Sequence, residues 1–306
     1  MGTCRLCGSN GPLRESHMLP KFVIKWIKDT SATGYFRMAT NPNRRQQDGK
    51  KMEFLCNNCE QRFSVFEKYF AEHVFRPYVE NELNEWGVAT NTITSFDYNE
   101  SLLAFILSVN WRILAYHIEK GLSDLPAATQ KKLTKQENSI RKYLLQECDI
   151  SGSNSSYLIF LQNLASGSGS LPPRMDPDIN FYLLRSVDGT LVTSPNGKTG
   201  FAYSKLGPFA LITSLIPDSI PKMSPLRVRK KGHISTSQQL TNTDITEFLF
   251  IDRPKEVSEN LTYSDKQQKQ ISRAIERNPD RANESMSAKM LISRQLMKDT
   301  IEENQR

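Results

Sequence analysis

Two Cys-x-x-Cys pairs near the N-terminus constrain the fold of this chain more than any other feature of its sequence. Cys4 and Cys7 form the first pair, and Cys56 and Cys59 form the second, with 48 residues between the pairs. A two-residue gap lets both sulfurs of a pair turn towards one tetrahedral zinc ion, which takes four thiolates in a structural site. Because the sequence has one further cysteine and begins without the apolar stretch of a secretory signal, metal binding is favoured over disulfides. The pattern predicts one structural zinc ion that joins both stretches of chain.

The residues around each pair predict how the ligands are presented. Gly8 and Gly11 place the first pair in a turn. From Asn58 onward, apolar residues recur at helical spacing until Pro77, so the second pair opens a helix. A knuckle, a hairpin and a helix whose first turn supplies the last two ligands form the treble-clef arrangement. The alternative, two unrelated pairs of buried thiols, leaves the matched spacing unexplained.

The segment between the pairs carries a second motif, Glu15-Ser16-His17-Met18-Leu19-Pro20, and Glu60 follows the second pair directly. In this order the residues resemble the zinc-stapled branch of the HNH, or His-Me finger, nucleases. There an acidic-His-hydrophobic-x-Pro segment follows the first cysteine pair, and Leu-Cys-x-x-Cys-His opens a helix. The resemblance covers residues 1–75 and departs from the family at Ser16, at Glu60 and at Lys51, which stands near the place of the middle asparagine. The residues that could take over the orienting role of that asparagine are Asn41, Asn43 and Gln47.

The resemblance implies a metal-dependent endonuclease. His17 would be a neutral imidazole that takes a proton from the water attacking a phosphodiester. A single Mg²⁺ or Mn²⁺ ion would need oxygen ligands, for which Glu60 is the first candidate, Glu67 the second and Ser16 a neighbour, with His73 as a further candidate. Glu60 equally suits a helix N-terminus as a carboxylate that complements the helix dipole. The alternative function is a non-catalytic zinc finger that binds nucleic acid or a protein partner.

Basic residues gather before the second cysteine pair. The chain has 40 Lys and Arg against 33 Asp and Glu, a net charge of +7. Arginines and lysines beside aromatic residues suit phosphate contacts and base stacking, so we expect DNA, rather than RNA, to bind here. A second basic cluster at residues 227–231 could extend this track. The predicted nucleic-acid-binding residues are Arg37, Arg44, Arg45, Lys50 and Lys51.

The rest of the chain predicts an α+β fold with a helical middle and a β-rich C-terminal region that ends in helices. Asn99–Lys120, with Gly121 as its stop, and Thr129–Cys148 have helical patterns, and Asp188-Gly189 predicts a hairpin turn between two strands. Glu247–Ile251 continues the β pattern, Ser264 caps a helix, and Ala282–Glu303 predicts another. The expected divisions are a nuclease-like domain at 1–90, a helical region at 91–150, a flexible linker at 151–178 and a recognition or regulatory region at 179–306.

The apolar stretch Leu102–Ile118 bears on localisation. Arg112 lies near its middle, where a membrane span would bury the charge, so we interpret the stretch as a core helix. We therefore expect a cytoplasmic protein with no membrane partner. The C-terminal region could recognise DNA, bind a partner or join a second copy of the chain. A regulated nuclease of this kind would suit defence against mobile DNA, an expectation that rests on analogy.

Overall fold

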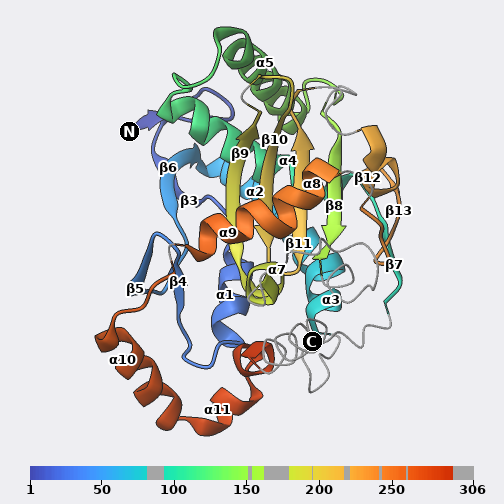
Figure 1. Cartoon of the computed structure of the whole chain (residues 1–306). Helices are drawn as coiled ribbons and strands as arrows, with labels where there is room; N and C mark the ends of the chain where they lie inside the picture. The colour runs from blue at the N-terminus through green and yellow to red at the C-terminus, as the bar shows by residue number, and fades with distance from the viewer. Residues whose placement is uncertain are drawn as a thin grey trace.

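A five-stranded antiparallel sheet and one long buried helix form the centre of an α+β fold (Figure 1). The N-terminal strands and helices lie on one side of this centre, and further helices cover the other face of the sheet. The computed structural model describes residues 1–80, 93–150, 154–161, 179–194, 196–216, 221–240, 243–259 and 261–291.

The N-terminal part consists of three short two-stranded sheets and two helices. Strand β3 pairs antiparallel with β6, so that His17 lies opposite Lys51, and a bulge separates Arg14 from Glu15. This pairing brings the segment that follows the first cysteine pair against the strand that leads into the second. The elements are β1 (Gly2–Thr3), β2 (Asn10–Gly11), β3 (Leu13–His17), α1 (Lys21–Asp29), β4 (Phe36–Met38), β5 (Asn41–Gln46), β6 (Lys51–Cys56) and α2 (Asn57–Phe70).

The helical middle is built around α4 (Glu100–Lys120). The Asn99 side chain accepts from the Ser101 amide at its start, and Gly121, with φ of 98°, ends it, as the sequence predicts. The helix is long and apolar enough to cross a membrane, but 78% of its most apolar window is buried inside the fold. The neighbouring elements are η1 (Ala71–Phe75), α3 (Arg76–Glu80), β7 (Ser95–Tyr98) and α5 (Ala127–Leu144).

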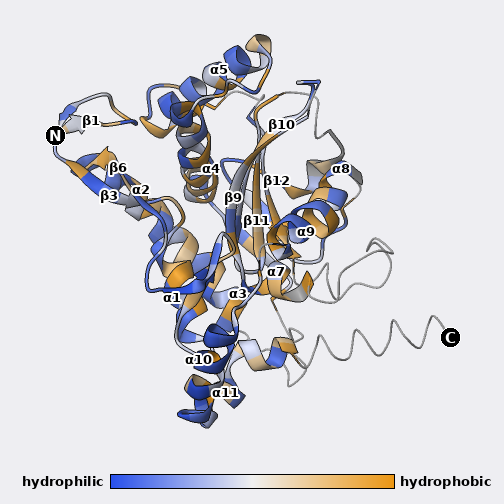
Figure 2. Cartoon of the chain, turned by 60° about the vertical axis from the view of Figure 1, so that its left-hand side comes forward, coloured by the Kyte–Doolittle hydropathy of each residue, from blue (hydrophilic) through white to orange (hydrophobic). Residues whose placement is uncertain are grey.

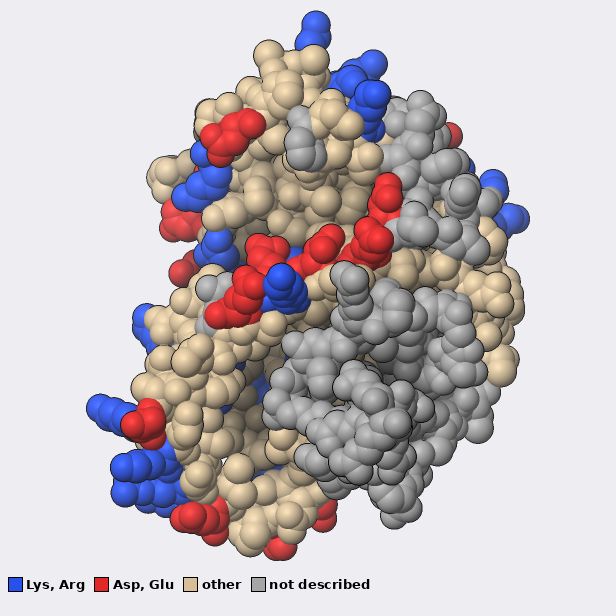
Figure 3. All heavy atoms as spheres, in the orientation of Figure 1, with Lys and Arg blue, Asp and Glu red and all other residues tan. Residues whose placement is uncertain are grey.

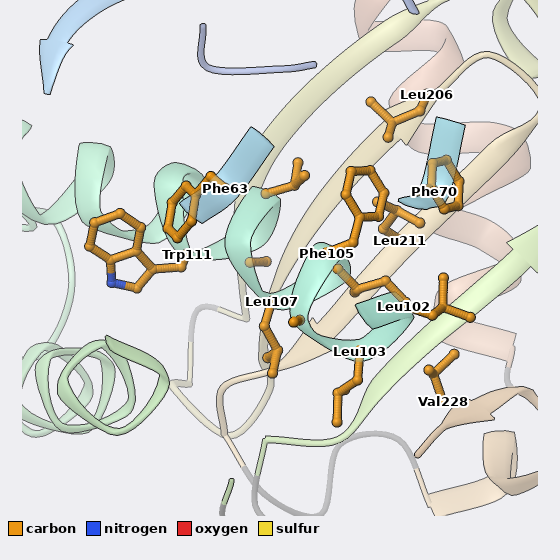
Figure 4. Close-up of a cluster of buried hydrophobic side chains, with 14 of the residues drawn as sticks. Phe63, Phe70, Leu102, Leu103, Phe105, Leu107, Trp111, Leu206, Leu211 and Val228 are labelled. Carbon is orange, nitrogen blue, oxygen red and sulfur yellow. The ribbon is translucent and has the colours of Figure 1, made fainter. Parts of the chain in front are cut away.

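The main hydrophobic core lies where α2, α4 and the sheet meet. Figure 4 shows Phe70 of α2, Phe105 of α4 and Leu211 of the sheet in this core. The rings of Phe70 and Phe105 stack with their centroids 4.2 Å apart. Burial of large aromatic side chains is the main favourable term in folding, so this core holds the N-terminal part against the sheet.

The sheet has the strand order β12-β8-β11-β10-β9. Side chains alternate between its two faces, and each face packs into a separate hydrophobic core. In β10, Ala202 and Leu206 face α4, whereas Phe201 and Tyr203 face the C-terminal helices. In Figure 2 the strands are largely hydrophobic, while α10 and α11 are largely hydrophilic and protrude. The elements are β8 (Ser156–Phe160), α7 (Ile179–Arg185), β9 (Val187–Thr193), β10 (Gly200–Leu206), β11 (Phe209–Ser214), η2 (Pro221–Leu226), β12 (Arg227–Val228), β13 (Gly232–Ser235), α8 (Thr243–Glu247), η3 (Phe248–Asp252), α9 (Arg253–Ser258), α10 (Asp265–Glu276) and α11 (Pro279–Glu284).

The hairpin predicted at Asp188-Gly189 is wrong, because β9 runs straight through both residues and the preceding segment is helix α7. The turn between β9 and β10 instead contains Gly197, with φ of 64°. Gly189 is required for a different reason. A Cβ at this position would lie 2.7 Å from Cδ1 of Ile113 in α4, so a larger residue here would force the end of that side chain to move.

Three further predictions for the C-terminal half need correction. Glu247–Ile251 is helical, because a short apolar run does not separate a strand from a buried helix. Within the predicted linker 151–178, the apolar run 156–160 forms β8, which is buried throughout; residues 151–153 and 162–178 lie outside the described residues. The predicted helix Ala282–Glu303 is interrupted at Ser285, and its part beyond residue 291 also lies outside them.

Candidate functional site

The two cysteine pairs are presented by a turn and by a helix start. In the first, the Gly8 amide donates to the Cys4 carbonyl at 2.9 Å, and Gly8 adopts a φ of 74° that favours glycine. In the second, Cys56 ends β6 and precedes α2, and Cys59 lies in the first turn of that helix. These local structures agree with those predicted from the spacing.

The four sulfur atoms lie within 4.8 Å of one another. The Sγ atoms of Cys7 and Cys56 are 3.8 Å apart, and a tetrahedral site with Zn–S bonds of about 2.3 Å has edges of about 3.8 Å. Burial opposes ionisation of Cys7, but hydrogen bonds from Ser9, Cys4 and Cys59 together lower its pKa to about 6. Burial raises the pKa of Cys4 and Cys59, so these two thiols depend on the charge of a bound metal ion to become thiolates. The cluster therefore fits a structural zinc ion held by Cys4, Cys7, Cys56 and Cys59.

His17 is the last residue of β3 and forms a pair with Asp48. Its Nε2 lies 2.7 Å from Oδ1 of Asp48, with 17% of the His17 side chain exposed. Asp48 also accepts from Lys51 Nζ at 2.7 Å and from the Gly49 amide at 2.9 Å. Burial opposes ionisation, but these donors together hold the pKa of Asp48 well below its usual range. Because an ionised carboxylate only accepts, Nε2 of His17 carries the proton and Nδ1 holds the lone pair of the neutral ring.

Asp48 is the residue that the sequence analysis missed. Of the three candidates for orienting His17, Asn43 is engaged elsewhere: it donates to the Thr262 carbonyl and accepts from the Ser264 amide. Asp48 was visible in the sequence only as the single acidic residue among the basic ones of residues 37–51. This isolated carboxylate in a basic segment is the one signal that the sequence offers for it, and nothing in the sequence connects it to His17.

Glu60 contacts Ser16 rather than His17. The fully buried hydroxyl of Ser16 donates to Oε2 of Glu60 at 2.7 Å. Neighbouring residues on a strand point to opposite faces, so Ser16 turns towards α2 while His17 turns towards Asp48. Two hard oxygen atoms thus lie together at the start of α2, and the imidazole points to the opposite face of the same strand.

Glu67 and His73 are engaged elsewhere. Oε1 of Glu67 accepts from Arg112 at 2.8 Å, and the Arg112 side chain is 1% exposed, so the carboxylate neutralises a buried charge of α4. His73 stacks on Tyr69 with ring centroids 4.6 Å apart. Neither residue has a contact with His17 or Glu60 in the described part of the chain. Across those residues, the four cysteines are the one group of three or more His, Cys, Asp or Glu side chains arranged to hold a metal.

The predicted basic residues do not form one surface. Lys51 reaches Asp48 beside His17, and Lys50 donates to the Tyr116 hydroxyl at 2.8 Å with its ammonium 3.9 Å from the centroid of that ring. Arg44 is exposed and has no hydrogen bond or ion pair to another described residue. The Arg45 guanidinium lies over the Tyr35 ring at 4.8 Å. Arg37 lines a cavity between the N-terminal elements and the C-terminal helices.

No family model matches this chain, and neither a curated protein nor a solved structure matches it. The fold and the site define an α+β protein with a four-cysteine cluster consistent with structural zinc.

Proposed function

We propose that this chain is a metal-dependent endonuclease of the HNH type that hydrolyses phosphodiester bonds of DNA, with His17 as general base. The observation that carries the proposal is the 2.7 Å contact between His17 Nε2 and Asp48 Oδ1. The contact lies at the end of β3, which follows the first cysteine pair and pairs with β6, the strand that ends at Cys56. In the proposed family, the catalytic histidine occupies this position of a zinc-stapled treble-clef finger.

The pair can perform general-base catalysis. Asp48 holds Nε2–H, which keeps the lone pair of a neutral His17 on Nδ1 and so leaves that atom to accept a proton from water. When the ring becomes an imidazolium, the Asp48 carboxylate stabilises its positive charge. Lys51 donates to the other carboxylate oxygen and keeps Asp48 ionised and oriented.

The oxygen atoms of Glu60 and Ser16 are the donors that Mg²⁺ or Mn²⁺ prefers. One Glu60 oxygen accepts from Ser16, so the second would be the atom that holds the cation. A bound cation supplies charge stabilisation for the leaving 3′ oxygen. The exposed side chains of Lys50 and Arg44, on the segment that carries Asp48, would supply positive charge for contacts with the DNA backbone.

The experiment is plasmid cleavage with Mg²⁺ or Mn²⁺ by wild type and by His17→Ala. We expect the variant to lose on the order of a hundredfold in rate, the range that a positioned general base supplies. His73→Ala is the matched control, because His73 is exposed and stacks on Tyr69 only. Unchanged zinc content and circular dichroism would show that His17→Ala remains folded. Equal cleavage by His17→Ala and wild type would eliminate the mechanism.

The Ser16–Glu60 hydrogen bond supports a second candidate function, a non-catalytic zinc module that binds nucleic acid or a partner. In that case the hydrogen bond fastens β3 to α2, and no exchangeable cation is needed. Titration with Mn²⁺, followed by its paramagnetic resonance, separates the two functions. A nuclease should bind one exchangeable ion that Glu60→Gln loses and that Glu72→Gln, on an exposed position, retains. A zinc module should bind none in any of the three proteins.

A further inference from the structure

A cavity of about 800 Å³ lies between the N-terminal elements and the C-terminal helices. Its walls come from α1 and β4 on one side and from α7, α9, α10 and α11 on the other. In Figure 3 this face of the molecule is hollowed below the band of acidic side chains that crosses α8, η3 and α9. The size is within the range of small-molecule sites. None of the lining residues belongs to the cysteine cluster or to the His17–Asp48 pair.

The exposed apolar side chains of the described chain gather around this cavity. Among all the residues that the structure describes, seven large hydrophobic side chains are exposed, and five of these seven line the cavity. Isolated exposed hydrophobic residues are ordinary, but a contiguous group around a hollow marks a binding surface. The five are Met38, Leu261, Tyr263, Ile275 and Leu291.

The charged residues of the wall are three arginines and one aspartate. Arg253 donates to both carboxylate oxygens of Asp188, at 2.6 and 2.7 Å, so these two charges compensate each other. Tyr182 adds a hydrogen bond to the same carboxylate at 3.0 Å. The remaining positive charge of the wall comes from Arg37 and Arg185.

Arg37 and Arg185 contact neutral groups only. Arg185, of which 9% is exposed, donates to the Thr30 hydroxyl and the Ile27 carbonyl at 2.7 and 2.9 Å. The Gln267 side-chain amide lies between Arg37 and the Asn43 carbonyl. With its nitrogen donating to Asn43, its oxygen accepts from Arg37 at 2.8 Å. The buried Nε of Arg37 has no hydrogen-bond partner among the described residues. Within the described ranges, neither guanidinium has a carboxylate within 4.0 Å.

Buried cations without a counter-charge are costly, because burial removes their hydration and nothing replaces it. The effect is visible in Arg185, where burial lowers the pKa to about 10. An anion bound in the cavity that both arginines line would supply the missing negative charge. The apolar rim would then contact the rest of such a molecule.

We propose that this cavity binds a small amphiphilic anion, with a carboxylate or phosphate head at Arg37 and Arg185 and an apolar body against the five exposed hydrophobic residues. The ligand bridges the N-terminal elements and α10, so its binding stabilises the fold. The proposal is independent of nuclease activity.

The test is calorimetric titration of the full chain with decanoate, decyl phosphate and decanol, each below its micelle concentration. We expect the anions to bind at least tenfold more tightly than decanol, because a charge-assisted hydrogen bond forms only with the anion. The better of the two anions identifies the head group. Arg37→Met should lower anion affinity about tenfold and leave decanol affinity nearly unchanged. Arg44→Met, in the adjacent strand and outside the cavity, should bind like wild type.

Ile275→Asp gives a second, independent measurement, because it should weaken decanoate and decanol alike by placing a carboxylate in the apolar wall. Circular dichroism of each variant checks that the fold is retained. Absence of binding by all three compounds, equal affinity for decanol and the anions, or unchanged anion affinity in a folded Arg37→Met would each overturn the proposal.

Discussion

Arg112 donates from Nη1 to Oε1 of Glu67 across 2.8 Å, so an arginine buried in the middle of α4 is neutralised from the neighbouring helix α2. Its guanidinium also lies over the Phe63 ring, 4.8 Å from the centroid. The residue that argues against a membrane span in the sequence thus joins α4 to the helix that carries Cys59.

Removing Glu67 should destabilise the protein strongly. Glu67→Ala leaves the Arg112 charge buried and unpaired, which typically costs about 3–5 kcal/mol of unfolding free energy. Urea unfolding measures the change. Glu72→Ala, at an exposed position of the next turn, should shift the free energy by no more than about 0.5 kcal/mol. Equal effects in the two variants would show that the ion pair contributes nothing.

Zinc content provides the second prediction. We expect one tightly bound zinc ion per chain, and we expect Cys59→Ser to lose it, because a three-thiolate site binds more weakly. The melting temperature should fall as well, because without zinc the start of α2 is no longer linked to the turn that carries Cys4 and Cys7. Elemental analysis and thermal unfolding measure both quantities. Cys148→Ser is the control, since that thiol is exposed and lies outside the cluster. Full zinc content in Cys59→Ser would contradict the four-thiolate assignment.

Lys205 makes the stability depend on pH. Its amine is buried in β10, where it donates to the Gly207 carbonyl at 2.6 Å. Burial, offset only in part by Asp188, holds its pKa well below 10.5. Between the folded pKa and 10.5 the unfolded chain binds the proton and the folded chain does not, so unfolding free energy rises with pH; above 10.5 this dependence ends.

Replacement of Lys205 by methionine removes that contribution. We expect the unfolding free energy of wild type minus that of Lys205→Met to increase as the pH is raised towards 10.5. Urea unfolding at several pH values gives this difference, in which the titration of the cysteines cancels. Lys198→Met, an exposed site, should show a constant difference. A constant difference for Lys205→Met as well would mean that the folded protein keeps the amine charged.

Asp48 gives a prediction for the proposed reaction. Asp48→Asn can still accept from His17 Nε2 but loses the charge that stabilises an imidazolium, so kcat should fall about tenfold or more with little change in KM. Steady-state cleavage kinetics separate the two parameters. Asp29→Asn, at an exposed site on α1, is the matched control. An unchanged kcat in Asp48→Asn would remove the orienting role.

Several features were predictable because the interactions that form them are local. The two-residue cysteine gaps, the Asn99 and Ser264 caps and the Gly121 stop each act within a few residues. The same reasoning failed at Asp188-Gly189, because the conformation of both residues depends on contacts with residues far along the chain. Asp188 accepts from Arg253, 65 positions along the chain, and Gly189 makes room for Ile113 of α4.

The candidate site shows the same division. The positions of the cysteines and of His17 could be read directly, whereas the partner of the imidazole could not, because Asp48 is 31 residues away and meets it only when β3 pairs with β6. Glu67 was a plausible ligand on helical spacing until α4 placed Arg112 beside it.

The amino-acid sequence by itself thus determined a zinc-type cysteine cluster, a buried central helix and an α+β class, since spacing, capping and apolar periodicity act along the chain. Only the tertiary structure decided which charges compensate one another, and it left Arg37 and Arg185 without a counter-ion in the described chain. Charge pairing depends on which side chains packing brings within a few ångströms, and no local pattern encodes that distance.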